Sequence, residues 1–122
     1  MTHEFYPISS AHLAKRRRAL APEIESAFAE FSQRVFAEGE LPAKVKELIA
    51  VAVAHVTQCP YCIRGHTRRA QRRGATDKEI MEAIWVAAEM RAGAAFAHSA
   101  LAIEAMGPPR AEQSTSETAT TG

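Results

Sequence analysis

Residues 45–66, VKELIAVAVAHVTQCPYCIRGH, carry the pattern from which the architecture of this chain follows. The first twelve of these residues are apolar almost all round a helix, which predicts a helix from Pro42 that is buried on most sides. We expect it to end near Thr57–Gln58, because Cys59 precedes a proline and such a residue disfavours the α region. Pro60 suits a first helical position, so a second helix is predicted with Cys59 at or near its N-cap. The stretch therefore predicts two helices joined by a sharp turn.

A further amphipathic helix is predicted upstream, over Pro22–Glu38. Its apolar stripe consists of residues at spacings of four, three and four, which are Ile24, Phe28, Phe31 and Val35. Gly39 is expected to end this helix. A shorter helix with a basic end is expected over Ile8–Leu20.

Downstream, the helix that begins at Pro60 is expected to reach Gly74, a typical C-terminal cap. Thr76 and Glu79 then form a capping-box pattern, which predicts a new helix start. One helix, or two with a break at Gly93, is expected over Asp77–Met106. Its buried face is expected to begin with Ile80, Ile84, Ala87, Ala88 and Met90.

The composition favours an all-helical protein. Hydrophobic residues make up 47% of the 122 residues and aromatic residues only 7%, so the apolar mass is mostly aliphatic and alanine, the strongest helix former. The length fits one domain with its own hydrophobic core. We expect a single helical domain over residues 1–106, with its core in 41–106, and a disordered polar tail over residues 107–122.

The charge balance gives no reason to expect a nucleic acid or a membrane as partner. Fifteen basic residues oppose 14 acidic ones, for a net charge of +1. The longest apolar run, Leu48–Ala54, is far too short to span a bilayer, and no targeting segment is recognisable. We therefore expect a cytoplasmic protein, and in that reducing compartment a lone CxxC is more often catalytic or metal-binding than a structural staple.

The residues Cys59, Cys62, His66 and Glu47 are the candidates for chemistry. The two cysteines, three residues apart, can close a disulfide, and the positive end of the helix dipole favours a thiolate. His66 lies on the helical face of Cys62, which is the arrangement of a nucleophile and its base. In an antiparallel hairpin Glu47 lies about 16 Å from the turn and His66 about 10 Å, so side chains or one water can link Glu47, His66 and Cys62.

Other interpretations of these four residues stay open at this stage. The cysteines can be two buried core thiols, or all four residues can be the ligands of a zinc site that stabilises an interaction module. Glu47 can also be an ordinary surface carboxylate that pairs with Lys44 or Lys46.

Several other residues are open to a functional and a structural interpretation. Arg64, Arg68 and Arg72 share one helical face, which we interpret as solvated or intersubunit rather than as a patch for an acidic partner. We expect His55 and His98 to be core histidines, with the alternative for His98 that it lines the site of a neighbouring subunit. Trp85 is expected to lie in the core or in an interface.

The pattern of Glu47, CPYC at 59–62, His66 and RRGATDKEI at 72–80 resembles the alkylhydroperoxidase D-like core of the carboxymuconolactone decarboxylase superfamily. The resemblance covers about Leu41–Met106. It implies a small all-α bundle that is an obligate homo-oligomer, a trimer or a hexamer. It also implies a peroxidase without metal or other cofactor, whose partners are a hydroperoxide and a dithiol reductant, either a lipoyl or a thioredoxin-like protein.

The resemblance assigns roles to the four candidates. Cys62 would be the attacking thiolate and Cys59 the resolving thiol, while Glu47 and His66 would carry protons to and from Cys62. One departure is Tyr61, where alkylhydroperoxidase D has a histidine and other redox members have tyrosine. It leaves the dithiol chemistry intact but weakens any claim to the same reductant or substrate. The decarboxylase branch lacks the cysteine pair, which argues against lactone decarboxylation, whereas a disulfide reductase or redox sensor would use the same CxxC.

Overall fold

The computed structural model describes residues 6–8 and 10–110, which form helices and connecting loops with no strand among them. The helices are α1 (Ala11–Leu20), α2 (Pro22–Phe36), α3 (Ala43–Thr57), α4 (Pro60–Arg72) and α5 (Asp77–Met106). The predicted all-α fold is thereby confirmed. Most of the predicted tail, residues 111–122, lies outside the described residues. None of the described helices is long and apolar enough to cross a membrane.

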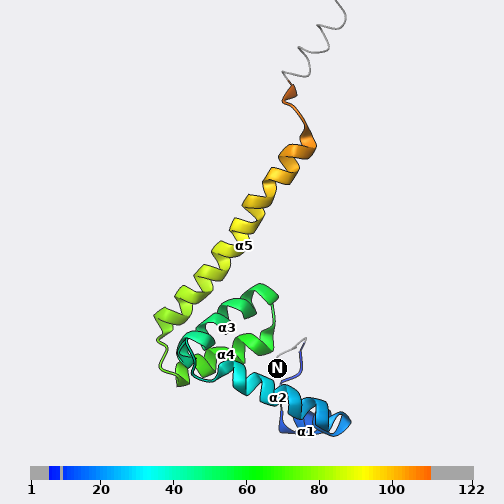
Figure 1. The fold of residues 1–122 in the computed structure, drawn as a ribbon, viewed down its shortest axis with the longest axis vertical. Helices are drawn as coiled ribbons and strands as arrows, with labels where there is room; N and C mark the ends of the chain where they lie inside the picture. Colours follow the sequence, from blue (N-terminus) through cyan, green and yellow to red (C-terminus); the bar gives the residue numbers. More distant parts are fainter. Residues whose placement is uncertain (1–5, 9, 111–122) are drawn as a thin grey trace, which may run out of the picture.

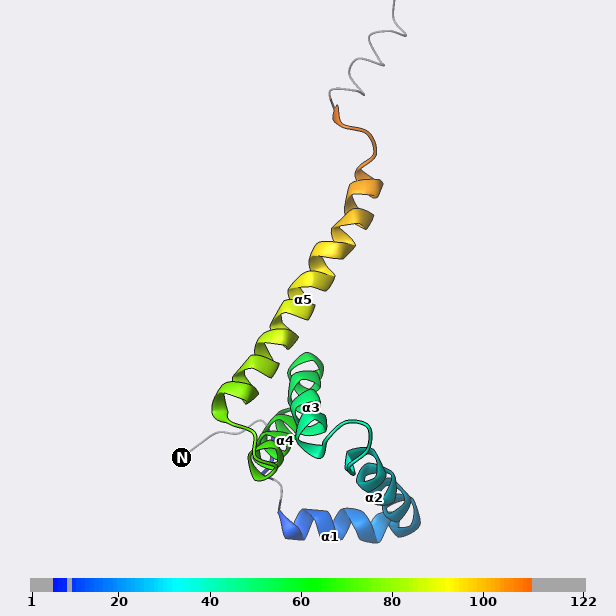
Figure 2. The same cartoon turned by 60° about the vertical axis from the view of Figure 1, so that its left-hand side comes forward.

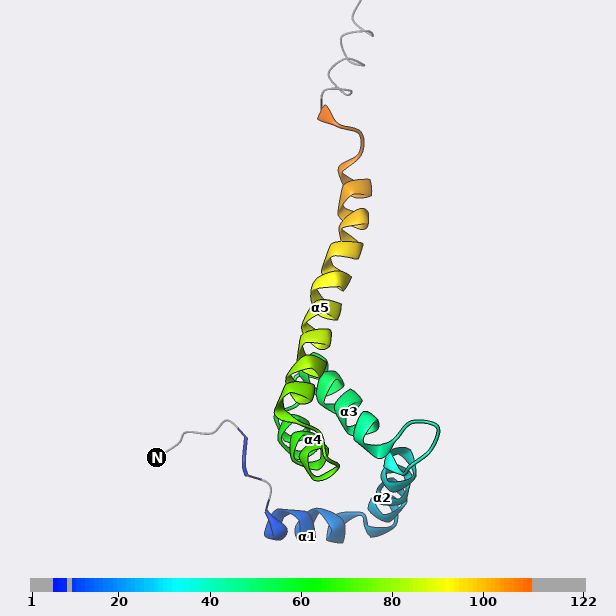
Figure 3. The ribbon, with the colours of Figure 1, turned by 90° about the vertical axis from the view of Figure 1, so that its left-hand side faces the viewer.

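The centre of the fold is α3, which packs against both α4 and the first half of α5. In Figure 1 the second half of α5 extends away from the other helices as a straight rod. Figure 2 shows α1 and α2 as an arm on the opposite side of the α3–α4 pair. In Figure 3 this arm approaches the pair at the C-terminal end of α2.

The predicted turn between α3 and α4 is confirmed. Gln58 ends α3 in the left-handed conformation, with φ 59° and ψ 48°. Cys59 follows directly as the N-cap of α4, and its sulfur accepts a hydrogen bond of 3.2 Å from the Cys62 N–H. Pro60 occupies the first helical position, where its missing N–H costs nothing. One residue therefore separates the end of α3 from the cap of α4.

The start of α5 also agrees with the sequence. Thr76 Oγ1 accepts a hydrogen bond from the Glu79 N–H, and Glu79 Oε1 accepts one from the Thr76 N–H, at 3.1 and 2.8 Å. This reciprocal pair is the predicted capping box. The helix then continues without a break through Gly93 to Met106, so the segment forms one helix and not two.

Four helix boundaries differ from the predictions. Pro42 is the N-cap of α3, which begins at Ala43, and α4 ends at Arg72 rather than at Gly74. The first helix begins at Ala11 rather than at Ile8, because the Ser10 hydroxyl caps it by accepting the Leu13 N–H at 3.2 Å. The second ends at Phe36 and not at Glu38, so Gly39 does not terminate it.

The buried core is small because it is built largely of alanine. One cluster of buried side chains joins α3, α4, the following loop and α5, and it consists of Val51, Ala70, Ala75 and Ile80; Leu48 and Ile84 pack against it. The prediction that α3 is buried on most sides is correct only in part, since most of its residues are buried or half-buried but Ile49 and Val53 are exposed.

The expected buried face of α5 is correct only in part. Ile80 and Ala87 are buried, but Ala88 and Met90 are exposed, because α5 meets α3 with one narrow stripe and then leaves it. Trp85, expected in the core or an interface, is 66% exposed and is therefore not a core residue of this chain.

Candidate active site

Cys59 and Cys62 are joined by a disulfide at the start of α4. Their Cα atoms are 5.2 Å apart, within the range that a disulfide spans. The pairing follows from the local fold, because an N-cap residue and the third residue of the same helix bring their side chains together over the first turn. The pair agrees with the sequence prediction that these two sulfurs can form a bond.

Glu47 from α3 and His66 from α4 are in direct contact. His66 Nδ1 and Glu47 Oε2 share a hydrogen bond of 2.6 Å, in which the imidazole N–H donates when the carboxylate is ionised. Glu47 is only 4% exposed, so its side of this hydrogen bond is shielded from solvent. The predicted link between the two residues therefore needs no bridging water.

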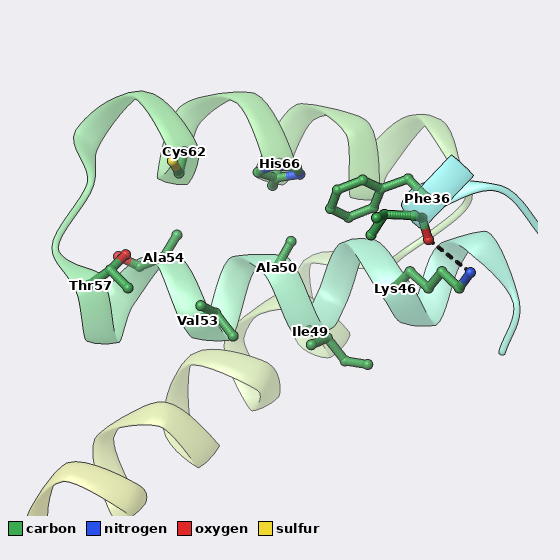
Figure 4. A pocket seen from close by; sticks show the side chains of 10 residues that line it. Phe36, Lys46, Ile49, Ala50, Val53, Ala54, Thr57, Cys62 and His66 are labelled. Atoms are coloured by element: carbon green, nitrogen blue, oxygen red, sulfur yellow. Dashed lines mark hydrogen bonds between the residues drawn. The ribbon is translucent and has the colours of Figure 1, made fainter. Parts of the chain in front are cut away.

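Cys62 and His66 open together onto a pocket of about 410 Å³. Figure 4 shows both side chains projecting from α4 toward α3 and into the pocket. The walls are otherwise mostly apolar and come from α3 and from the end of α2, which contributes Val35 and Phe36. Since His66 Nδ1 is engaged by Glu47, Nε2 is the ring nitrogen left to exchange a proton with a group in the pocket.

A second, polar cleft lies beside Glu47. It has a volume of about 360 Å³ and is lined by Glu47, Arg69, Arg72 and Arg73. These three arginines are exposed, and so are Arg64 and Arg68, which agrees with the solvated face expected for Arg64, Arg68 and Arg72. Glu47 therefore borders a polar cleft as well as contacting His66.

The interpretation of Glu47 as a surface carboxylate is wrong. Lys44 pairs instead with Glu79 at 2.8 Å, and Lys46 Nζ donates to the Val35 and Ala37 carbonyls. The hydrogen bond from Lys44, followed by that from the Thr76 backbone, lowers the pKa of Glu79 below its usual value.

The other polar candidates take no part in this pocket. His55 shares a hydrogen bond of 2.7 Å with the Val51 carbonyl and is half-buried, as a satisfied structural histidine would be. His98 is exposed on the outer half of α5, so the core position expected for it is wrong. The Tyr61 hydroxyl donates a hydrogen bond to the Pro7 carbonyl at 2.7 Å.

The zinc interpretation applies only to the reduced protein, in which the sulfurs of Cys59 and Cys62 are not bonded to each other. Within residues 6–8 and 10–110, no three or more histidine, cysteine, aspartate or glutamate side chains converge on one point.

The sequence did not point to Phe36 or Lys46 as residues of this site. The Phe36 ring stacks on the His66 imidazole, with 5.0 Å between ring centres, and both residues line the pocket with Lys46. Phe36 lies just outside the apolar stripe of α2, and an aromatic residue off the stripe at a helix end was the signal available in the sequence.

Several relatives of known sequence or structure are similar to this chain. A protein described as "Uncharacterized protein 4 in cox locus" from Paracoccus denitrificans is 61% identical over 93 residues, which cover 76% of this chain and 83% of the relative. An uncharacterized protein from Cupriavidus necator is 41% identical over 83 residues, which cover 66% of this chain and 74% of the relative.

Two solved structures of carboxymuconolactone decarboxylase family proteins are similar to this chain in fold. A carboxymuconolactone decarboxylase family protein from Legionella pneumophila is 37% identical with a TM-score of 0.62, over 77% of this chain and 83% of the other. A protein of the same family from Thermotoga maritima, described as "possibly involved in antioxidative response", is 29% identical with a TM-score of 0.50, over 68% and 95% of the two chains. The model of the carboxymuconolactone decarboxylase family matches residues 22–105. The chain therefore belongs to the carboxymuconolactone decarboxylase family.

Proposed function

We propose that this protein is a thiol-dependent peroxidase that reduces hydroperoxides through a Cys59–Cys62 dithiol/disulfide cycle. One observation supports the proposal. Cys62, which can form a disulfide with Cys59, shares a mostly apolar pocket with His66, and the buried Glu47 carboxylate binds Nδ1 of that histidine. Family membership and the antioxidative response named for the Thermotoga relative are compatible with this activity.

The cycle begins with the reduced dithiol. His66 Nε2 takes the proton of the Cys62 thiol, and Glu47 stabilises the imidazolium that forms. The thiolate attacks the distal oxygen of the hydroperoxide, so that an S–O bond forms while the O–O bond breaks. The leaving alkoxide takes the proton from His66 and departs as an alcohol, or as water when the substrate is hydrogen peroxide. Cys62 is now a sulfenic acid.

The second half of the cycle restores the thiols. The Cys59 thiol attacks the sulfenic sulfur of Cys62, which forms the disulfide and releases water. A dithiol donor, lipoyl or thioredoxin-like, then reduces the disulfide by exchange and leaves with its own sulfurs oxidised. The cycle requires a compartment in which such donors stay reduced, so we propose the cytoplasm as its location.

The experiment that tests the proposal follows thiol loss in reduced protein after one equivalent of tert-butyl hydroperoxide. The wild-type protein should lose two thiols per chain and release one equivalent of tert-butanol. Cys62→Ser should consume no peroxide, whereas Cys59→Ser should consume one equivalent and retain a sulfenic acid at Cys62 that dimedone traps. Equal peroxide consumption by wild type and Cys62→Ser would refute the assignment. A disulfide that donor proteins reduce rapidly, in a chain inert to peroxide, would favour a reductase or redox sensor.

We also propose that the protein functions as a homo-oligomer, a trimer or a hexamer. The outer half of α5 exposes large apolar side chains that the described chain leaves uncovered, among them Phe96 at 81% exposure, Leu101, Ile103 and Met106. The apolar face of α3 beside the pocket is exposed as well. Exposed apolar area on this scale is typical of a protein–protein interface. Sedimentation of the full chain should show a trimer or hexamer, and a folded monomer would contradict this assignment.

A further inference from the structure

The end of α2 places an aromatic ring on the face of His66. The Phe36 and His66 rings are 5.0 Å apart with 29° between their planes, which is a stacked geometry. Phe36 is half-buried, while the apolar stripe residues Phe28 and Phe31 of the same helix are exposed and contact each other. Phe36 is thus the aromatic residue of α2 that packs against the α3–α4 pair.

Lys46 holds the end of α2 in this position. Its Nζ donates to the Val35 carbonyl at 2.8 Å and to the Ala37 carbonyl at 2.7 Å, on either side of Phe36 (the first of these bonds is dashed in Figure 4). Carbonyls at a helix C-terminus lack partners within the helix, and a cation there also favours the helix dipole. These charge-assisted bonds explain why α2 stops at Phe36 and turns there.

A single helix thereby organises two sides of the imidazole. Lys46 and Glu47 are neighbours on α3, and consecutive helical residues point in directions about 100° apart. Lys46 accordingly reaches α2, while Glu47 reaches α4 and binds His66 Nδ1. Among the charged and titratable groups near His66, Glu47 contacts Nδ1, and Lys46 and Cys62 line the same pocket as the ring. Arg69, Arg72 and Arg73 line the polar cleft on the other side of Glu47. From α2 the pocket receives only Val35 and Phe36.

We propose that Phe36, anchored by Lys46, is a positioning residue that fixes the His66 ring with Nε2 toward Cys62. The hydrogen bond to Glu47 alone fixes the position of Nδ1 but does not fix the tilt of the ring plane. A flat apolar surface against the ring removes that freedom and keeps water from one face of the ring. The contribution to peroxide reduction rests on the proposed function, whereas the orientation of the ring does not.

The test compares variants that keep or remove each contact. Phe36→Leu keeps an apolar side chain but removes the flat face, and Phe36→Tyr restores it. Lys46→Met keeps the stem but removes both hydrogen bonds, and Lys46→Arg restores a donor. Phe31→Leu is the matched control, because Phe31 lies on the same helix and is 63% exposed.

Two readouts need no peroxide. One is the pH profile of Cys62 alkylation by iodoacetamide in the reduced Cys59→Ser background, and the other is the NMR resonance of the His66 ring. Phe36→Leu and Lys46→Met should change both, whereas Phe36→Tyr, Lys46→Arg and Phe31→Leu should stay close to wild type. With tert-butyl hydroperoxide, the first two variants should oxidise Cys62 roughly 10- to 100-fold more slowly, the scale expected for a misplaced catalytic group.

The outcomes separate this inference from the proposed function. If wild type reduces peroxide and Phe36→Leu matches it in rate, alkylation profile and resonance, the positioning role is wrong. The positioning role is also wrong if Phe36→Tyr lowers the rate of Cys62 oxidation as much as Phe36→Leu does. If Phe36→Leu changes alkylation and resonance in a chain that does not reduce peroxide, the positioning role stands and the peroxidase proposal fails. Should Phe36→Leu not fold, Lys46→Met decides: an unchanged alkylation profile refutes the inference, and a changed one supports it.

Discussion

Replacement of Glu47 by glutamine separates the two roles that this buried carboxylate has in the proposed cycle. Glu47 is 4% exposed and its Oε2 lies 2.6 Å from His66 Nδ1. In Glu47→Gln the amide oxygen still accepts the imidazole N–H, so the ring keeps a partner of similar shape. The amide carries no negative charge, however, and can neither stabilise an imidazolium nor accept a proton. Stability should therefore change little, while reactivity should fall strongly.

The two effects have different magnitudes. A hydrogen bond to a charged group contributes about 1.5–3 kcal/mol and a neutral one about 0.5–1.5, so Glu47→Gln should cost roughly 1 kcal/mol of unfolding free energy. Glu47→Leu leaves the partly buried His66 imidazole without its hydrogen-bond partner and should cost more, about 1–3 kcal/mol. General acid–base catalysis contributes about 10²- to 10⁴-fold in rate, which corresponds to about 3–5 kcal/mol of barrier.

Urea denaturation of the reduced protein measures the first quantity, and stopped-flow oxidation of Cys62 by tert-butyl hydroperoxide measures the second. Glu47→Gln should unfold close to wild type and react at least about 100-fold more slowly. A glutamine variant that reacts at the wild-type rate would show that the carboxylate only holds the ring. A glutamine variant as unstable as Glu47→Leu would show that the hydrogen bond to His66 does not hold the two helices together.

Three predictions concern the framework around the site. Val51 is fully buried against α4 and α5, so Val51→Ala should lower the unfolding free energy by about 2 kcal/mol in urea titrations, and an unchanged midpoint would contradict the core as described. Thr76→Ala removes the cap of α5 and should cost about 1 kcal/mol in the same titration; no loss would mean that the capping box does not stabilise the helix. Glu79 has a lowered pKa in the folded chain, so its contribution is present above the ordinary glutamate pKa and is lost as the pH falls through the folded value. Glu79→Gln should thus lower the melting temperature at neutral pH but not at strongly acid pH, and an equal loss at both would refute the role of the ion pair with Lys44.

The local parts of this structure could be predicted from the sequence because they depend on neighbours along the chain. The proline after Cys59 and the capping pattern at Thr76 determine helix ends by short-range hydrogen bonding, and both ends were predicted correctly. Helical spacing likewise placed Cys62 and His66 on one face. The contact between Glu47 and His66 could be anticipated because only one short turn separates the two helices.

The parts that could not be predicted depend on how distant elements meet. Nothing local to α2 indicates that Lys46 will bind its last carbonyls, so the position of Phe36 against His66 was not foreseen. Periodicity also identifies an apolar face without identifying what covers it. For this reason Met90 was placed on a buried face and Trp85 in the core or an interface, whereas the described chain leaves both exposed.

Gln58 gives the turn between α3 and α4 a specific requirement. A left-handed conformation costs an ordinary residue about 1–2 kcal/mol, and here a glutamine adopts it with φ 59°. Because no other residue intervenes before the Cys59 cap, the torsion angles at position 58 set the direction in which α4 departs and hence the alignment of the carboxylate, imidazole and sulfur. Asparagine or glycine at this position would preserve that alignment with less strain. Isoleucine or valine, which avoid these angles, would displace the three groups together without altering any of them.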